Sequence, residues 1–171
     1  MELKPTIFEF TSYKVEPDKK KIFFNYTVKF KNTPDISFTE TIILPKAPDF
    51  KRIPEELFNK ILQNLHLALG VSYYKLHCAT KFKVNYLLSE EEADFWNVFY
   101  KKGLGEFLFR NKLDPQIVPD FAFRKGKKSQ PFRVERNRRF LVGVGGGKDS
   151  IVSVELLKKY GADFSLIYTE T

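Results

Sequence analysis

Apolar and polar residues alternate through most of the first 45 residues, and this period of two is typical of half-buried β-strands. Two runs rich in Phe, Tyr and Val, IFEFTSYKVE and KIFFNYTVKF, flank a turn-forming cluster that begins at Pro17, so they predict a hairpin. A third strand is expected in ISFTETIILP, where Ile36, Phe38 and Ile42 alternate with other residues and Pro45 marks the end.

After Pro54 the alternation gives way to a helical period. Leu57, Ile61 and Leu65 recur on one face of the expected helix, and we expect Gly70 to end it. The run KFKVNYLL, which follows some ten residues later, predicts one further strand.

A second helix has a clear start signal. Ser89 and Glu92 have the spacing of a capping box, in which the serine hydroxyl accepts a hydrogen bond from the third helical amide. We expect Gly103 and Gly105 to break or bend this helix. Four aromatic residues at helical spacing are expected in the core: Phe95, Trp96, Phe99 and Tyr100.

The end of the chain predicts a βαβ unit. A strand over 140–144, a helix from 149 to 160 and a strand over 164–168 are expected, with Gly161 stopping the helix. A crossover helix between two strands implies a parallel sheet. Because two strands and one helix cannot cover both faces of such a sheet, we expect the protein to continue beyond Thr171.

Together these patterns predict two domains. Residues 1–110 are expected to form an α+β N-terminal domain of antiparallel strands plus helices. Residues 111–138 contain three prolines and a Lys-Gly-Lys-Lys cluster, and we expect them to form a basic linker. Residues 139–171 are expected to begin an incomplete α/β domain with a parallel sheet.

Composition excludes several classes of protein. The 171 residues are 43% hydrophobic, which is enough for a core, and no apolar run approaches the length of a membrane span. The single cysteine, Cys78, excludes an internal disulfide, and with two histidines it is too little for a structural zinc site. The N-terminus carries charges where a signal peptide would be apolar, so a cytoplasmic location is expected.

The net charge of +8 is concentrated in one segment. Residues 101–140 hold 12 of the 29 basic and 4 of the 21 acidic residues, which leaves 17 of each elsewhere. A basic segment that leads into a glycine-rich stretch at 143–147 suits a polyanionic partner such as a nucleotide, a nucleotide-sugar or RNA. A solvated linker of the same composition is the alternative.

The sequence GVGGGKDS, over 143–150, has four glycines at the end of the expected strand and in the turn before the helix. Such a turn presents backbone N–H groups and the positive end of the helix dipole, which favours phosphate. A Walker A loop is excluded because Val142 stands at its first glycine and Asp149 follows the lysine. The dinucleotide pattern GxGxxG is excluded because Lys148 stands at its third glycine.

Residues 145–150, GGGKDS, resemble the PP-loop, SGGxDS, of enzymes that adenylate a substrate and release pyrophosphate. Gly145 stands where that family has a leading serine, so one hydroxyl is missing. The alternative is a tight structural turn. The resemblance implies that the ATP phosphates and a Mg²⁺ ion are held by Gly145, Gly146, Gly147, Lys148, Asp149 and Ser150.

Different groups of the loop have different expected roles. The three glycines are expected to donate backbone hydrogen bonds, Lys148 to neutralise phosphate charge, and Ser150 to add a hydroxyl. Asp149 cannot attract phosphate itself and is expected to act through Mg²⁺ or to interact with the helix dipole. Simple helix capping by Asp149 and Ser150 is the alternative.

A longer resemblance covers nearly the whole chain. The segments LHLALGVSYYKLH (65–77), YKKGLGEFLFRN (100–111) and GVGGGKDSIVSVELL (143–157) are similar to the ATP-dependent UDP-N-acetylmuramoyl-L-alanyl-L-glutamate epimerase family, MurL. The resemblance implies inversion of the terminal L-glutamate of UDP-MurNAc-L-Ala-L-Glu to D-glutamate for peptidoglycan synthesis. It leaves open whether the product passes directly to a dedicated ligase.

The chemistry expected of such a protein begins with the glutamate carboxylate. Conversion to an acyl-adenylate removes its negative charge, so a modest base could deprotonate the α-carbon and allow reprotonation from the other face. The base is not identified, and we expect Cys78 to be a buried structural thiol rather than a partner of His77. Substrate contacts are expected from Tyr73, Tyr74 and Lys75, and contacts to the UDP diphosphate from Arg136, Arg138 and Arg139.

Two other functions remain open on sequence grounds. One is a PP-loop enzyme of tRNA modification, which would use the basic segment for RNA, although nucleic acid is the less favoured partner. The other is a recognition module that does not catalyse a reaction. As part of a longer epimerase, the 171 residues alone are not expected to be active.

Overall fold

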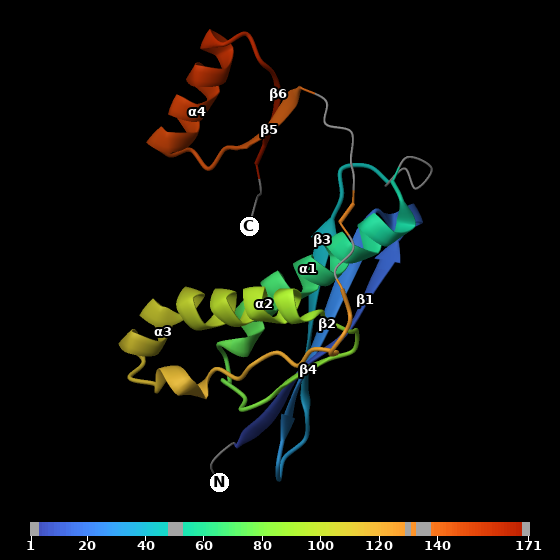
Figure 1. The fold of residues 1–171 in the computed structure, drawn as a ribbon, viewed down its shortest axis with the longest axis vertical. Helices are drawn as coiled ribbons and strands as arrows, with labels where there is room; N and C mark the ends of the chain where they lie inside the picture. Colours follow the sequence, from blue (N-terminus) through green and yellow to red (C-terminus); the bar gives the residue numbers. More distant parts are fainter. Residues whose placement is uncertain (1–3, 48–52, 129–130, 133–137, 169–171) are drawn as a thin grey trace. The chain divides into compact units, whose positions relative to one another are not determined.

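The computed structural model describes residues 4–47, 53–128, 131–132 and 138–168. The chain forms two compact units, Met1–Gln130 and Pro131–Thr171, which are described separately (Figure 1). The first unit extends past residue 110 because Val118 and Phe121, each 2% exposed, belong to its core. Much of the segment expected to be a linker is therefore packed against the first unit.

The first unit is built on a mixed sheet with the strand order β3-β2-β1-β4 (Figure 1). β2 is antiparallel to both β1 and β3, whereas the short β4 pairs with β1 in parallel. A 3-10 turn, Pro17–Lys19, closes the predicted hairpin, which is confirmed. The strands are β1 (Pro5–Glu16), β2 (Lys21–Phe30), β3 (Ile36–Ile43) and β4 (Phe82–Val84).

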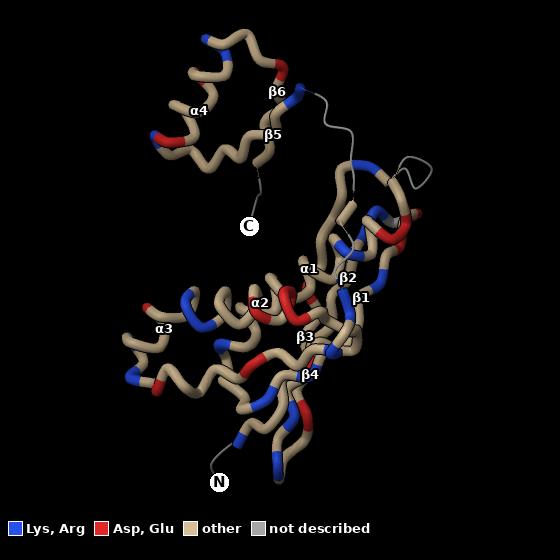
Figure 2. Tube along the Cα trace, in the orientation of Figure 1, with Lys and Arg blue, Asp and Glu red and all other residues tan. Residues whose placement is uncertain are grey.

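Alternation gives the sheet one apolar and one polar face. On the apolar face, Phe8, Phe10, Phe24 and Tyr26 are completely buried. On the polar face, the Glu9 carboxylate forms ion pairs with Lys29 at 3.0 Å and with Lys83 at 2.7 Å. Acidic and basic residues are interspersed over this unit (Figure 2).

Helix α1 (Glu55–Tyr74) packs on the apolar face of the sheet. The prediction that Gly70 ends this helix is wrong, because α1 continues for another four residues. A β-carbon at Gly70 would lie 2.5 Å from Cε1 of Phe10 and 3.1 Å from Cε1 of Tyr26. Glycine is therefore required at this position by the close approach of helix to sheet.

The capping box at the start of α2 (Glu90–Gly103) is confirmed. The Ser89 hydroxyl accepts from the Glu92 amide at 3.3 Å, and the Glu92 carboxylate accepts from the Ser89 amide at 2.9 Å. The break at the two glycines is also confirmed, since α3 (Gly105–Arg110) follows as a separate helix. A short 3-10 turn, Pro115–Ile117, comes next.

Only half of the aromatic stripe of α2 lies in the core. Trp96 is 4% exposed and Tyr100 is fully buried, whereas Phe95 and Phe99 are 59% and 42% exposed. The prediction is therefore wrong for the last two residues. Both side chains are exposed, and they stack on each other at 6.2 Å between ring centroids.

The second unit has the predicted βαβ arrangement. β5 (Arg139–Gly143) and β6 (Asp163–Ile167) are parallel and are joined through α4 (Lys148–Lys159). Among the described residues of this unit no side chain is buried, and Leu141, Ile151 and Leu166 are each more than half exposed. None of the described helices in either unit is long and apolar enough to cross a membrane.

Candidate functional site

The glycine loop joins β5 to α4 in the second unit. Val144, at its start, is held by a hydrogen bond from its amide to the carbonyl of Ile167 at 2.8 Å, which continues the pairing of β5 with β6. Gly146 has a φ of +80°, in the left-handed region that favours glycine. The helix then begins at Lys148, immediately after Gly147.

The start of α4 has no side-chain cap. Gly147 is the N-cap residue, and its carbonyl accepts from the Ile151 amide at 3.4 Å and from the Ser150 hydroxyl at 2.8 Å. The first amides of the helix are therefore not satisfied by a capping side chain, which leaves them available to an anion. The single hydroxyl proton of Ser150 is already donated, so in this conformation its oxygen is an acceptor.

Crowding within the chain does not explain the loop glycines. A β-carbon at Gly143, Gly145, Gly146 or Gly147 would meet no described atom within 4 Å. Only Gly146 has a backbone conformation that disfavours other residues. Close approach of an external group to the backbone remains a physical reason for glycine at Gly145 and Gly147, and this agrees with a phosphate site.

The charged residues of the loop are exposed to solvent. Lys148 and Asp149 form no ion pair among the described residues, so both side chains are available to a ligand. Among these residues there is also no group of three or more His, Cys, Asp or Glu side chains that could hold a metal alone. A Mg²⁺ ion here would have to take most of its ligands from phosphate and water, as is usual for this ion.

The predicted substrate residues of the first unit differ in their surroundings. The hydroxyl of Tyr73 donates to the Glu40 carboxylate at 2.8 Å, and burial, with this carboxylate, raises the pKa of Tyr73 to about 12. Tyr74 is fully buried and its hydroxyl points to the Ile117 carbonyl at 3.5 Å, so it is a core residue in this structure. Lys75 is half-buried and lines a cavity.

The predicted arginine contacts lie at the start of the second unit. Arg139 forms an ion pair with Asp163 at 3.6 Å and donates to the Ser165 hydroxyl at 2.9 Å, so it connects β5 to β6. Arg138 is exposed, and Arg136 lies outside the described residues. Contacts from these arginines to a diphosphate stay a prediction.

Several cations of the basic segment have local partners. Lys101 pairs with Asp120 at 2.6 Å, and Arg110 pairs with Glu106 at 2.8 Å one helical turn away. Lys127 donates to the carbonyl of Leu87. Some of the positive charge of this segment is therefore engaged in contacts within the first unit.

Cys78 and His77 follow α1 rather than lying on a strand. The thiol is 8% exposed, burial raises its pKa, and its nearest polar contact is the carbonyl of Lys75 at 3.8 Å. The His77 ring packs edge-on against Phe30. The two side chains form no hydrogen bond with each other, which agrees with a structural thiol.

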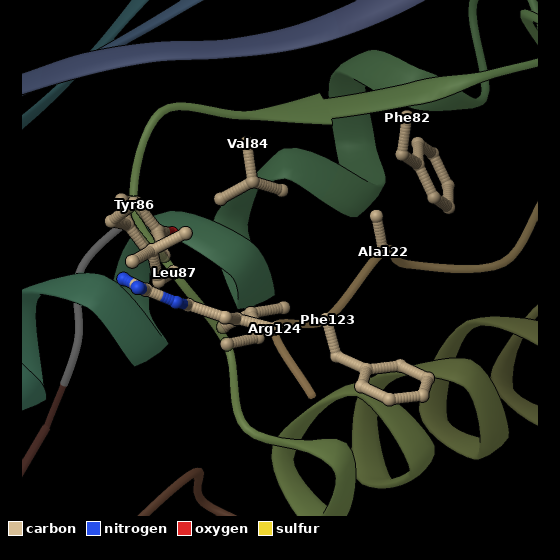
Figure 3. A pocket seen from close by; sticks show the side chains of 8 residues that line it. Phe82, Val84, Tyr86, Leu87, Ala122, Phe123 and Arg124 are labelled. Carbon is tan, nitrogen blue, oxygen red and sulfur yellow. The ribbon is translucent and has the colours of Figure 1, made fainter. Parts of the chain in front are cut away.

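A pocket of about 270 Å³ opens beside β4 (Figure 3). Its walls come from the strand and from the segment around Phe123, and they are mostly apolar. Arg124 is the one charged residue among its described lining residues. Tyr86 also lines the pocket, and its hydroxyl donates to the carbonyl of Gln63 at 3.0 Å.

Comparison with known proteins identifies the family. The chain matches the MurL N-terminal domain over residues 2–170. It is 34% identical over 159 residues to a UDP-N-acetyl-alpha-D-muramoyl-L-alanyl-L-glutamate epimerase of Micromonospora sp., covering 91% of this chain and 35% of the relative. The epimerase of the same name from Salinispora tropica is 33% identical over 160 residues, with 91% and 34% covered.

A third relative of the same name, from Xanthomonas oryzae pv. oryzae, is 33% identical over 126 residues, covering 72% of this chain and 28% of the relative. No solved structure matches the chain. The chain spans about a third of the length of the curated relatives it matches. Across that third, the match runs through both units described above, and the chain belongs to the family of the MurL N-terminal domain.

Proposed function

We propose that this chain forms the N-terminal part of an ATP-dependent epimerase that converts the terminal L-glutamate of UDP-MurNAc-L-Ala-L-Glu to D-glutamate. The observation that carries the proposal is the match of almost the whole chain to relatives named as epimerases of this molecule. Because the chain spans about a third of those relatives, the activity belongs to the protein of which these residues are a part.

The glycine loop is the proposed site for the phosphates of ATP. Backbone amides over 145–147 and the uncapped start of α4 supply hydrogen-bond donors, and the loop surface is free of covering atoms within the described chain. Lys148 supplies a positive charge beside them. Ser150 would have to release the Gly147 carbonyl before it could donate to phosphate.

Asp149 is the proposed contact to Mg²⁺. It is exposed in the first turn of α4, and a lone carboxylate there fits an ion that keeps phosphate and water as its other ligands. Bound Mg²⁺ would offset the negative charge of the phosphates. Without it, Asp149 would repel ATP, so the proposal requires the two to bind together.

ATP addresses the acidity of the glutamate α-proton. A carbanion beside an ionised carboxylate is strongly disfavoured, whereas an acyl-adenylate carries no such charge at the carbonyl and has a good leaving group. Proton removal and return on opposite faces then invert the carbon, and attack of water on the acyl-adenylate restores the carboxylate and releases AMP. No described residue is assigned as the base, since Cys78 is buried and its pKa is raised.

The proposal is tested with the intact protein, ATP, Mg²⁺ and UDP-MurNAc-L-Ala-L-Glu. Formation of D-glutamate together with AMP and pyrophosphate supports it, and inversion without AMP would overturn the acyl-adenylate. Lys148→Ala should lower the formation of D-glutamate and of AMP in parallel. Lys158→Ala, on the same helix and paired with Glu155 at 2.7 Å, is the matched control and should retain activity.

A further inference from the structure

The first unit contains a cavity of about 630 Å³ between the start of β1, the end of α1 and the segment after α3. It is more than twice the volume of the pocket beside β4, and it is lined by polar as well as apolar groups. Its polar lining residues are Lys4, Lys75, His77, Cys78, Thr80 and Asn111. We call it the Lys4–Lys75 cavity.

The charge in this cavity has one sign. Lys4 and Lys75 both line it, and none of its described lining residues is acidic. Neither ammonium group has an ion-pair partner among the described residues. Two unpaired ammonium groups at one cavity give it a positive potential.

The walls around these lysines are held in place by the fold. Thr80 donates its hydroxyl to the Thr6 carbonyl at 3.2 Å, and Asn111 donates its side-chain amide to the Phe107 carbonyl at 2.8 Å. The amide of Cys78 is fixed to the Tyr74 carbonyl at 2.8 Å. The oxygen of the Asn111 side chain and the hydroxyl of Thr80 keep acceptor capacity toward a ligand.

We infer that the Lys4–Lys75 cavity binds a small molecule that carries an anionic oxygen group, a carboxylate or a phosphate, together with an apolar portion. The two ammonium groups take the anion, and the apolar portion lies against Leu76, Leu113 and Ile117. If the proposed function holds, this ligand is one end of the nucleotide-sugar peptide: its peptide carboxylates or its diphosphate. All described lining residues of the cavity belong to the first unit, whereas the glycine loop belongs to the second.

The positive potential can be measured without any substrate, because Cys78 is the single cysteine of the chain and lines this cavity. Its modification is followed with an anionic (sulfonatoethyl) and a cationic (trimethylammonioethyl) methanethiosulfonate, each rate divided by that reagent's rate with free glutathione. We expect the normalised anionic rate to exceed the cationic one. Lys75→Gln should reduce the ratio by about threefold or more at low salt, and Lys4→Gln should act in the same direction.

Lys102→Gln is the matched control, since that lysine lies at the end of α2 and does not line the cavity. A ratio that is unchanged in both cavity variants, or that favours the cation, overturns the inference. This result would leave the proposed epimerase function untouched, because the reagents do not report on catalysis.

The source of the anion is then distinguished by NMR, with the His77 ring signals as reporter. N-Acetyl-L-alanyl-L-glutamate supplies carboxylates, UDP supplies a diphosphate, and N-acetyl-L-alanyl-L-glutamine amide is the uncharged control. Saturable shifts with either anion, weakened about fivefold in Lys75→Gln, support the site and identify the group it takes. No shift with either anion, or equal shifts with the uncharged peptide, overturns it even where Cys78 reacts too slowly for comparison.

Discussion

Gly70 and Phe10 approach so closely that a β-carbon on Gly70 would lie 2.5 Å from Cε1 of Phe10. The missing side chain allows α1 to pack closely against the apolar face of the sheet. Two tyrosine hydroxyls donate to carbonyls of α1: Tyr26 of β2 to His66 at 2.9 Å, and Tyr100 of α2 to Leu67 at 2.7 Å. The packing of the first unit therefore depends on a position without a side chain in mid-helix.

Gly70→Ala is expected to destabilise the first unit by about 1–3 kcal/mol, because overpacking outweighs a helix-propensity gain of about 1 kcal/mol. Urea unfolding followed by the fluorescence of Trp96, the single tryptophan and a core residue, measures the change. Gly103→Ala is the control, since a β-carbon there would meet no other element within 4 Å in the described chain. Equal stability of Gly70→Ala and the parent chain would contradict the packing described.

His66 should make the stability of the first unit depend on pH. Its ring is fully buried, Nε2 donates to the Asn25 carbonyl at 3.0 Å, and buried Nδ1 has no hydrogen-bond partner among the described residues. Burial lowers the pKa of His66 to about 4, below its value of 6.5 when unfolded. The unfolded state therefore binds the proton more readily, and stability is present above pH 6.5 and is lost as pH falls toward 4.

The expected loss across that range is about 3 kcal/mol, measured by urea unfolding at several pH values. His66→Gln should be less stable than the parent chain but should lose this part of the pH dependence. His77→Gln keeps His66 intact and should retain it. The same pH slope in all three chains would show that carboxylates, not His66, dominate the effect.

The capping box at α2 gives a third test. Ser89→Ala removes the hydroxyl that accepts from the Glu92 amide, and a loss of about 1 kcal/mol is expected in the same unfolding assay. Ser72→Ala, at an exposed position inside α1, should change stability by a few tenths of a kcal/mol at most. An equal effect of the two substitutions would mean that the cap contributes nothing.

Substitutions of two loop glycines distinguish a conformational role of glycine from direct contact with a ligand. Gly146→Ala should weaken MgATP binding and strain the loop, because φ is +80° there. Gly145→Ala introduces no contact within the described chain, so unfolding should be unchanged while MgATP binding weakens by about tenfold if the phosphates approach this backbone. Isothermal titration calorimetry measures MgATP binding by each variant, and urea unfolding measures stability. Unaltered binding in Gly145→Ala would argue against a phosphate at this position.

The sequence predicted features that depend on neighbours along the chain. The hairpin, the capping box at Ser89 and the βαβ unit around the glycine loop are all local, and all three were found. Gly70 was misjudged because its role arises from Phe10, sixty residues away. A period of 3.6 likewise places Phe95 and Phe99 near Trp96, but it does not show how wide a face the sheet covers.

The Lys4–Lys75 cavity shows the same limit. Its two lysines lie far apart in sequence and are brought together only because the start of β1 passes the end of α1. Lys75 was singled out through a family resemblance, whereas Lys4, Thr80 and Asn111 carry no local signal. The glycine loop is the opposite case, since the donors proposed for phosphate are consecutive residues.

The central claim is tested most directly by incubating the intact protein with MgATP and UDP-MurNAc-L-Ala-L-Glu in deuterated water. The account predicts D-glutamate carrying deuterium at the α-carbon, with AMP and pyrophosphate formed alongside it, and a parallel loss of these products in Lys148→Ala. Inversion that proceeds without ATP, or ATP hydrolysis with no change at the glutamate α-carbon, would contradict it.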